Sequence, residues 1–365
     1  MCQRLIVADE SHEGAVHMQI STLGIDIAKN VFQVHGVDAA EQVVLKKQLR
    51  RGQVLEFVGR LQPCLIGMEA CATSHHWARE FRRLGHDVQL MPPGYVRAYV
   101  KRSKNDAADA AAICEAVRRP SMRFVPIKNA EQQAALMLHR TRDLLIRQRT
   151  QLINAMRAHL AELGLVAPKG REGLQQLLRT VAQAEEEQLP SDARLACETL
   201  AAQLQAVQHR IDALEKRIHQ AHRANPASKR LDAIAGFGVI VSSAVAATMT
   251  DPKAFKTGRE FAAWIGLVPR QNSTGGKERL GSISKQGDRY LRRLLIVGAL
   301  AVIKSARTRP DKYPWVVALL GRRPAKVVAV ALANKMARIA WAVLVRGETY
   351  RAATHASSRA LAAGV

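Results

Sequence analysis

Residues 19–37, QISTLGIDIAKNVFQVHGV, contain two short apolar runs separated by a polar break, a pattern typical of neighbouring β-strands. A third such run, EQVVLKKQL, follows at 41–49, and CLIGMEA and HDVQLMP add two more short strands. Helical spacing lies between them in GQVLEFVGRLQ and HHWAREFRRLG, and after them in NDAADAAAICEAVRR. The order β-β-β-α-β-α-β-α predicts a mixed sheet with helices on its faces over residues 20–125.

The rest of the chain changes character twice. Residues 126–225 are rich in Ala, Leu, Gln, Arg and Glu, and they carry apolar residues at alternating spacings of 3 and 4, as in a coiled coil. This seam predicts either an antiparallel hairpin within the chain or a dimer interface. The seam consists of Cys197, Leu200, Leu204, Val207, Ile211, Leu214 and Ile218.

The pattern of residues 226–345 predicts a mainly helical third domain. The chain also has an N-terminal extension at 1–19 and a C-terminal tail at 346–365.

Charge indicates the kind of partner. The 365 residues include 55 Lys and Arg against 31 Asp and Glu, a formal charge of +24. Such an excess favours nucleic acid, because neutralising phosphates releases counterions. The five cysteines form no C-x-x-C pair, which argues against a disulfide framework or a structural zinc site. No run is apolar for long enough to predict a membrane span, so we expect a cytoplasmic protein.

Four acids stand out in this basic chain. Asp26 and Glu69 follow apolar strand residues, and alternation places Asp26 on the sheet face opposite Ile25. Asp106 and Asp109 are three residues apart, so they share one helix face. A single strand Asp is usually a turn residue, and a helical D-x-x-D usually complements the helix dipole. The combination instead predicts converging carboxylates that can hold Mg²⁺, since that ion prefers oxygen ligands.

Basic residues flank these acids and recur near the end of the chain. Between Arg270 and Lys326 there are 14 Lys and Arg but three acids, and such residues contact phosphates unless they form a solvated face. IAGFGVIVSSAVAA resembles a helix–hairpin–helix whose glycines present N–H groups to phosphate, or else a tight turn packed by small residues. The expected nucleic-acid contacts are Arg97, Lys101, Arg102, Lys104, Gly236, Gly238, Lys277, Lys285, Arg289, Arg292 and Arg293.

Several of these motifs carry a family resemblance. GIDIAKN, GMEAC and KNDAADA resemble the D, E, D, D blocks of the DEDD transposases of bacterial insertion sequences. The first domain of that family is similar to Holliday-junction resolvases and has a ribonuclease-H-like fold. GLVPRQNSTGGKERLGSISKQGDRYLRRLL, residues 266–295, resembles the family's second transposase domain, so the likeness covers roughly residues 20–345.

The resemblance implies a function and a set of site residues. Asp26, Glu69, Asp106 and Asp109 become the catalytic metal ligands, for two Mg²⁺ ions with Mn²⁺ as a substitute. A serine nucleophile that becomes linked to DNA matches Ser273, although many relatives have Ser-Ser-Gly where this chain has Ser273-Thr274-Gly275, which leaves Thr274 open. The family also implies a structured noncoding guide RNA, a dimer or tetramer, and a location at the bacterial nucleoid.

Other functions fit parts of the same pattern. A junction-resolving nuclease would use the carboxylates alone, with water as nucleophile. A non-enzymatic nucleic-acid-binding protein would need the positive charge but neither Asp26 nor Glu69. If the carboxylates activate the serine, the two domains must meet around DNA, from one chain or from two subunits.

Overall fold

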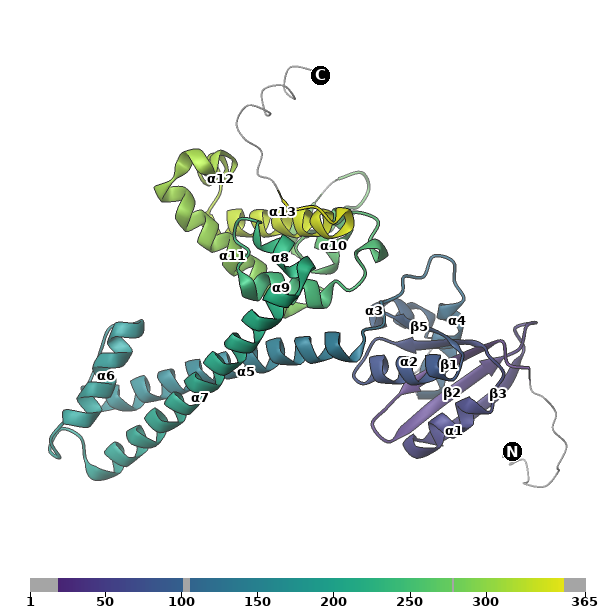
Figure 1. Cartoon of the computed structure of the whole chain (residues 1–365), viewed down its shortest axis with the longest axis horizontal. Helices are drawn as coiled ribbons and strands as arrows, with labels where there is room; N and C mark the ends of the chain where they lie inside the picture. The colour runs from purple at the N-terminus through teal and green to yellow at the C-terminus, as the bar shows by residue number, and fades with distance from the viewer. Residues whose placement is uncertain (1–18, 101–105, 278, 351–365) are drawn as a thin grey trace, which may run out of the picture. The chain divides into compact units, whose positions relative to one another are not determined.

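A computed structural model describes residues 19–100, 106–277 and 279–350. The chain forms two compact units, one ending at Asn129 and the other beginning at Ala130 (Figure 1). Each unit has its own hydrophobic core. The expected division between residues 225 and 226 lies within the second unit, where the long helices and the C-terminal helices pack together.

The first unit is built on one five-stranded sheet in the order β3-β2-β1-β4-β5. The first three strands form an antiparallel meander, while β4 and β5 run parallel to β1. The mixed sheet predicted from the sequence is therefore confirmed. The strands are β1 (Thr22–Ile27), β2 (Val31–Val37), β3 (Val43–Arg50), β4 (Leu65–Glu69) and β5 (Asp87–Met91).

Helices cover both faces of this sheet. Val54, Val58 and Phe81 pack with Leu23 and Ile25 of β1 in the core on one face. The other face is covered by α4, which contacts β1, β2 and β4. The helices and 3₁₀ turns of this unit are η1 (Arg51–Gln53), α1 (Val54–Gly59), α2 (Ser74–Arg83), α3 (Pro93–Val96), η2 (Arg97–Tyr99) and α4 (Asp106–Val117).

Two long helices, α5 (Ala130–Glu162) and α7 (Ser191–Ala224), lie side by side and antiparallel in the second unit (Figure 1). Arg142 of α5 pairs with Glu215 of α7. Arg149, seven residues further along α5, donates to Gln208, seven residues earlier on α7, as the antiparallel direction requires. The helix α6 (Arg171–Gln183) lies at the end of this pair where the chain passes from α5 to α7 (Figure 1). These contacts pair α7 with a helix of the same chain, and the coiled coil expected from the seam stays a prediction.

The remaining helices enclose the largest hydrophobic core among the described residues. Its centre is formed by α11 and α13, with Leu295, Ala299 and Ala337 among the buried residues. The elements are α8 (Pro226–Asp232), α9 (Val239–Thr248), η3 (Pro252–Ala254), α10 (Gly258–Trp264), β6 (Pro269–Gln271), β7 (Leu280–Ile283), α11 (Arg289–Thr308), η4 (Pro310–Lys312), α12 (Pro314–Leu320) and α13 (Ala325–Arg346).

One of these helices, α13, is long and apolar enough to cross a membrane. Of its most apolar window, 44% is buried inside the protein, and a core helix of a globular protein meets the same criterion. Eight of its residues lie in the core, so packing against α10 and α11 accounts for its composition.

Candidate active site

The candidate active site lies at the carboxyl end of β1. Ile25 is fully buried on the core face, whereas Asp26 is half-buried on the opposite face. This is the alternation that the sequence predicts. Because β4 runs parallel to β1, both strands end at the same edge of the sheet.

Two glycines bring α4 against the sheet. A Cβ at Gly24 would lie 2.3 Å from the carbonyl oxygen of Ala110 and 2.5 Å from the amide nitrogen of Cys114. A Cβ at Gly67, the registered partner of Gly24, would lie 2.8 Å from Cβ of Val117. The Cys114 thiol also donates to the carbonyl oxygen of Thr22, at 3.7 Å. The missing side chains thus let α4 approach the sheet directly.

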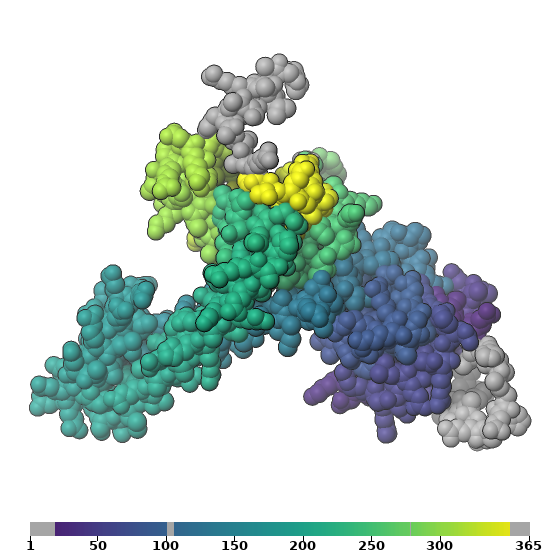
Figure 2. Space-filling view, viewed as in Figure 1, coloured from purple at the N-terminus to yellow at the C-terminus, as the bar shows by residue number. Residues whose placement is uncertain are grey.

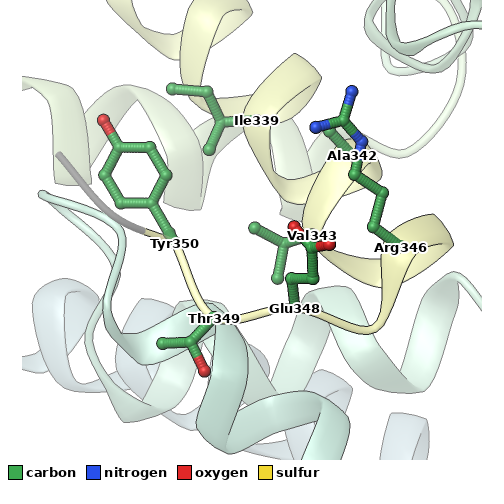
Figure 3. A pocket seen from close by; sticks show the side chains of 7 residues that line it. All are labelled: Ile339, Ala342, Val343, Arg346, Glu348, Thr349 and Tyr350. Atoms are coloured by element: carbon green, nitrogen blue, oxygen red, sulfur yellow. The ribbon is translucent and has the colours of Figure 1, made fainter. Parts of the chain in front are cut away.

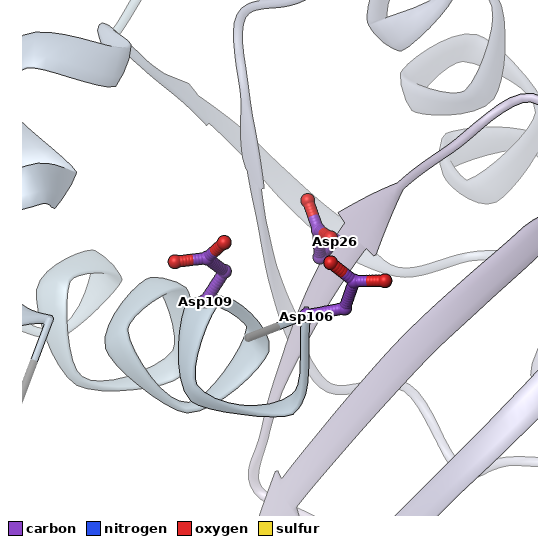
Figure 4. Close-up of side chains that lie close together, drawn as sticks. All are labelled: Asp26, Asp106 and Asp109. Atoms are coloured by element: carbon purple, nitrogen blue, oxygen red, sulfur yellow. The ribbon is translucent and has the colours of Figure 1, made fainter. Parts of the chain in front are cut away.

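This seating carries the first turn of α4 to the end of β1. Carboxylate oxygens of Asp26, Asp106 and Asp109 all lie within 4.8 Å of one another (Figure 4). Three hard oxygen donors at this spacing fit a divalent cation such as Mg²⁺, which prefers carboxylates and water. The structure brings together three of the four acids that the sequence singled out.

The fourth acid, Glu69, ends β4. Ile25 of β1 pairs with Met68 of the neighbouring strand β4. Asp26 follows Ile25, and Glu69 follows Met68, so the two acids occupy corresponding positions on adjacent strands. The pKa of the Cys71 thiol is raised by partial desolvation, and then by the negative charges of Glu69 and Asp26. Glu69 therefore contributes to the same electrostatic environment, although it is not part of the three-carboxylate cluster.

The basic segment before α4 is only partly described. Arg97 is exposed in η2, within the first unit. Lys101, Arg102 and Lys104 lie outside the described residues. Their expected contacts with the nucleic-acid backbone remain predictions.

The segment QNSTGG of the second unit forms the tip of a hairpin between β6 and β7. Gly275 and Gly276 have φ angles of +55° and +76°, as a two-residue type I′ turn requires, and Lys277 N–H donates to Thr274 O at 3.1 Å. The Oγ of Ser273 accepts a hydrogen bond from the backbone N–H of Arg279 at 3.2 Å. Ser273 and Thr274 are both exposed at this tip.

The cations expected to contact nucleic acid differ in their surroundings. Lys277, Lys285 and Arg289 are exposed. Arg292 is 9% exposed, and its Nη1 donates to the carbonyl oxygens of Ile265 at 2.7 Å and Gln286 at 2.6 Å. Burial lowers the pKa of Arg292. This guanidinium therefore joins backbone segments inside the unit, and the phosphate contact expected of Arg292 stays a prediction.

Arg293, on the same helix, has a different partner. It pairs with Asp143 of α5 and its guanidinium carbon lies 5.5 Å from the ring centroid of Tyr290. The Arg293 side chain remains 45% exposed. A phosphate that binds Arg293 would therefore compete with the carboxylate of Asp143.

The two glycines of the expected hairpin also differ. Gly236 has a φ angle of +86°, and a Cβ there would lie 2.8 Å from the carbonyl oxygen of Gly298 on α11. Gly236 therefore packs backbone to backbone, as in the small-residue alternative. Gly238 is the exposed N-cap residue of α9, and its Cβ would meet nothing within 4 Å.

His139, a buried histidine of α5, is not among the residues that the sequence patterns single out. His139 is 1% exposed, and its two ring nitrogens lie 3.1 Å from the hydroxyls of Tyr290 and Ser243. It thereby joins α5 to α11 and α9. Burial, and then the positive charge of Arg142, lower its pKa to about 4. A helical histidine that follows Leu136 and Leu138 resembles a core residue, so nothing in its local sequence marks this network.

The described part of the second unit also has hollows. One, of about 730 Å³, lies at the end of α13 and is lined by Arg346, Glu348 and Tyr350 among others (Figure 3). Its described lining contains one acid, Glu348, and so no cluster of carboxylates comparable with that of Asp26, Asp106 and Asp109.

Clustered carboxylates at the end of a mixed sheet, within so basic a chain, are the arrangement expected of the class of metal-dependent enzymes that act on phosphodiesters. Sequence comparison agrees. Residues 23–164 match a family described as a transposase, of the DEDD IS110 type, and residues 228–314 match the family described as Transposase IS116/IS110/IS902.

Full-length relatives share this assignment. A probable family 20 transposase of Pseudomonas aeruginosa is 53% identical over 336 residues, which cover 92% of this chain and 99% of the relative. A putative transposase of Sinorhizobium fredii is 46% identical, over 97% of this chain and 91% of its own length. The transposase for the element IS1328 of Yersinia enterocolitica is 39% identical, over 91% and 98%.

The chain belongs to the IS110/IS116 family of transposases. It is therefore an enzyme that cleaves and joins DNA, and the DEDD family assignment agrees with use of a divalent metal.

Proposed function

We propose that the chain excises and inserts its own insertion sequence by Mg²⁺-dependent strand cleavage and rejoining, with Ser273 as the nucleophile. Asp26, Glu69, Asp106 and Asp109 would hold two Mg²⁺ ions, with Mn²⁺ as a substitute. The observation that carries the proposal is the convergence of three of these carboxylates from β1 and α4, within 4.8 Å of one another.

The carboxylates have a clear chemical role in such a reaction. Bound divalent cations stabilise the negative charge that develops on the phosphodiester oxygens. The acids of this chain would offset the charge of the cations. The buried strand β1 and the glycine-seated helix α4 hold these acids in place before DNA arrives. Glu69 is included because it shares the sheet edge and the electrostatic environment of Asp26.

Ser273 would attack the scissile phosphorus. Its Oγ forms a bond to phosphorus while the bond from phosphorus to the leaving sugar oxygen breaks. The serine proton passes to a base, and the leaving oxygen gains a proton. A sugar hydroxyl then reverses the step, so the number of phosphodiester bonds is conserved. The Arg279 N–H, which donates to this Oγ, supports the choice because it stabilises negative charge on the oxygen.

Further parts of the proposal rest on the family resemblance with support from the fold. The strand order 3-2-1-4-5 supports a ribonuclease-H-like domain at 20–125. The registered antiparallel pair of α5 and α7 supports a coiled coil over 126–225, ahead of a transposase domain at 226–345. A structured noncoding guide RNA and assembly into a dimer or tetramer complete the proposal, and the charge of +24 suits two nucleic-acid partners.

The test of the metal site is a cleavage assay with purified protein, RNA derived from the element, labelled element-end DNA and Mg²⁺. Asp26→Asn should abolish strand cleavage and leave DNA affinity similar or higher, because it removes a ligand and a negative charge. Asp87→Asn is the matched control, since Asp87 is exposed at the opposite, amino end of the parallel strand β5. Undiminished cleavage by Asp26→Asn combined with Glu69→Gln would refute the metal site.

The test of the nucleophile uses the same assay on denaturing gels. Ser273→Ala should remove the protein-linked DNA strand, whereas Thr274→Ala should retain it. Loss of the adduct only in Thr274→Ala would transfer the role to Thr274. Cleavage without any adduct that still depends on Asp26 would instead favour a junction-resolving nuclease that uses water.

A further inference from the structure

The outer face of α13 borders a hollow of about 700 Å³ that no part of the proposed cleavage chemistry uses. Its walls come from the start of α10, from Trp315 on α12 and from the stretch of α13 between Ala331 and Ala342. All of these elements belong to the second unit, and the surface of α13 is visible in yellow in Figure 2.

The hollow is strongly cationic. Arg259, Lys335 and Arg338 line it and are exposed, while no Asp or Glu is among the described residues of its lining. The neighbouring acid, Glu260, accepts a hydrogen bond from the backbone N–H of Lys256 at 2.6 Å, within the cap of α10. The charge of the hollow therefore fits a phosphate group.

The hollow also has an aromatic platform. The Trp315 side chain is 42% exposed, and the ammonium group of Lys335 lies 4.4 Å from its ring centroid. The second tryptophan of the lining, Trp341, is held in the wall of the hollow by a hydrogen bond. Its indole N–H donates to the carbonyl oxygen of Pro252 at 3.0 Å. Trp315 is thus an exposed ring with a cation over one of its faces, which leaves the opposite face for a base.

The walls of the hollow are held by close packing. A Cβ at Gly258 would lie 3.0 Å from the carbonyl oxygen of Arg338 and 3.2 Å from the ring of Trp341, so α10 meets α13 closely here. Asn334 donates to the carbonyl oxygen of Leu267 at 3.2 Å, which fixes a further part of the lining. The site is therefore shaped before any ligand arrives.

The hollow continues along the same helix. It shares Ile339 and Ala342 with the second hollow at the end of α13, which Arg346 also lines (Figure 3). Lys335, Arg338 and Arg346 are exposed along α13, and the rise of a helix puts the first and last about 16 Å apart. Glu348, at the far end, contributes the only acid to the described lining of the two hollows.

We propose that this hollow binds an unstacked nucleotide of single-stranded DNA, with the base on Trp315 and the flanking phosphates on Lys335, Arg338 and Arg259. Stacking on an exposed aromatic ring requires a free base face, which a duplex does not offer. DNA is the substrate of the enzyme, and cleavage and strand exchange expose unpaired nucleotides. The proposal depends on that substrate but not on the carboxylates or on Ser273.

The test measures binding of the full chain to a fluorescently labelled thymidine oligonucleotide by anisotropy and by quenching of tryptophan fluorescence. A chelator is present, so no cleavage occurs. Trp315→Ala should weaken single-strand binding by about 5- to 150-fold, which corresponds to the 1–3 kcal/mol that stacking contributes per base. Trp315→Phe should retain most of the affinity, and duplex binding should change by less than about twofold.

Paired variants separate the platform from general charge. Lys335→Ala combined with Arg338→Ala should weaken single-strand binding and reduce its salt dependence, whereas Lys304→Ala, an exposed cation on α11, should leave single-strand binding unchanged. Unchanged single-strand binding by Trp315→Ala, or equal loss of single-strand and duplex binding, overturns the proposal. So does a loss restricted to an RNA oligonucleotide of the same length, which would assign the hollow to RNA.

Each variant is first checked for an unchanged thermal unfolding curve. If Trp315→Ala alters that curve, Trp315→His, which keeps a smaller ring, should show an intermediate single-strand affinity, and full wild-type affinity would overturn the proposal. The outcome is also distinct from failure of the cleavage chemistry, since Asp26→Asn should bind the oligonucleotide like the unmodified chain under these conditions.

Discussion

Gly24 of β1 lies directly opposite Gly67 of the parallel strand β4, and α4 packs over both of them. The pair leaves a smooth patch on the sheet, and the backbone of α4 occupies the space that a side chain at Gly24 would fill. Because Asp106 and Asp109 begin α4, this patch sets the position of two candidate metal ligands relative to Asp26.

Gly24→Ala should therefore impair catalysis without touching a ligand. Its Cβ would lie 2.3 Å from a backbone oxygen that no rotamer change can move, so α4 must shift. We expect a loss of about 1–3 kcal/mol in the free energy of unfolding and a larger relative loss of strand cleavage than of DNA binding. Gly52→Ala is the control, because its Cβ would meet nothing within 4 Å. Wild-type cleavage by Gly24→Ala would show that α4 does not position the acids.

The buried His139 should make stability depend on pH. Its pKa in the folded protein is about 4, below the ordinary value of 6.5, so folding favours the neutral ring. This contribution is complete above pH 6.5 and is lost as the pH falls toward 4, by up to about 3 kcal/mol. Chemical unfolding curves between pH 7 and 4 should show a steeper decline for the unmodified chain than for His139→Gln.

A second histidine serves as the control for this loss of stability at low pH. His219 is exposed on α7, and His219→Gln should leave the pH dependence of unfolding unchanged. If His139→Gln and the unmodified chain lose stability in parallel on acidification, then Tyr290 and Ser243 do not hold a neutral imidazole in the way that their 3.1 Å contacts indicate.

The long helices should be stabilised by the predicted seam. Ile211 is 2% exposed on α7, and Ile211→Ala should cost about 2–5 kcal/mol in the free energy of unfolding, through lost burial and the cavity left behind. Leu195 on the same helix is 65% exposed, so Leu195→Ala should stay within about 0.5 kcal/mol. Denaturant unfolding followed by circular dichroism measures both. Equal effects would contradict the packing of α5 on α7.

Arg292 and Arg289 should affect different properties of α11. Arg292→Ala leaves the carbonyl oxygens of Ile265 and Gln286 without their donor and should cost about 1–3 kcal/mol of stability. Arg289→Ala should leave stability unchanged, and if this exposed residue contacts a phosphate the salt-dependence slope of duplex binding should fall by about 0.9. A smaller slope for Arg292→Ala with unaltered stability would instead support the phosphate contact expected of Arg292 from the sequence.

The sequence by itself determined the elements and the type of chemistry. Period-2 alternation around Asp26 and the spacing of Asp106 and Asp109 are local properties, since a strand alternates faces and a helix repeats every 3.6 residues. The heptad spacing through Leu204 and Ile211 likewise predicted a packed seam, and the sequence motifs pointed to the transposase family that the comparisons confirmed. Each of these signals is readable within a few turns of chain.

Only the tertiary structure decided which residues meet. Helix α7 packs against α5 of the same chain, Arg292 reaches carbonyls 6 and 27 residues away, and Gly236 abuts Gly298 on α11. His139 finds hydroxyls 104 and 151 residues distant. No local pattern encodes such contacts, because burial and hydrogen bonding between distant segments depend on how whole elements pack. A cation in a basic run can equally reach solvent, a phosphate or a buried carbonyl, and the packing of α11 made that choice for Arg292.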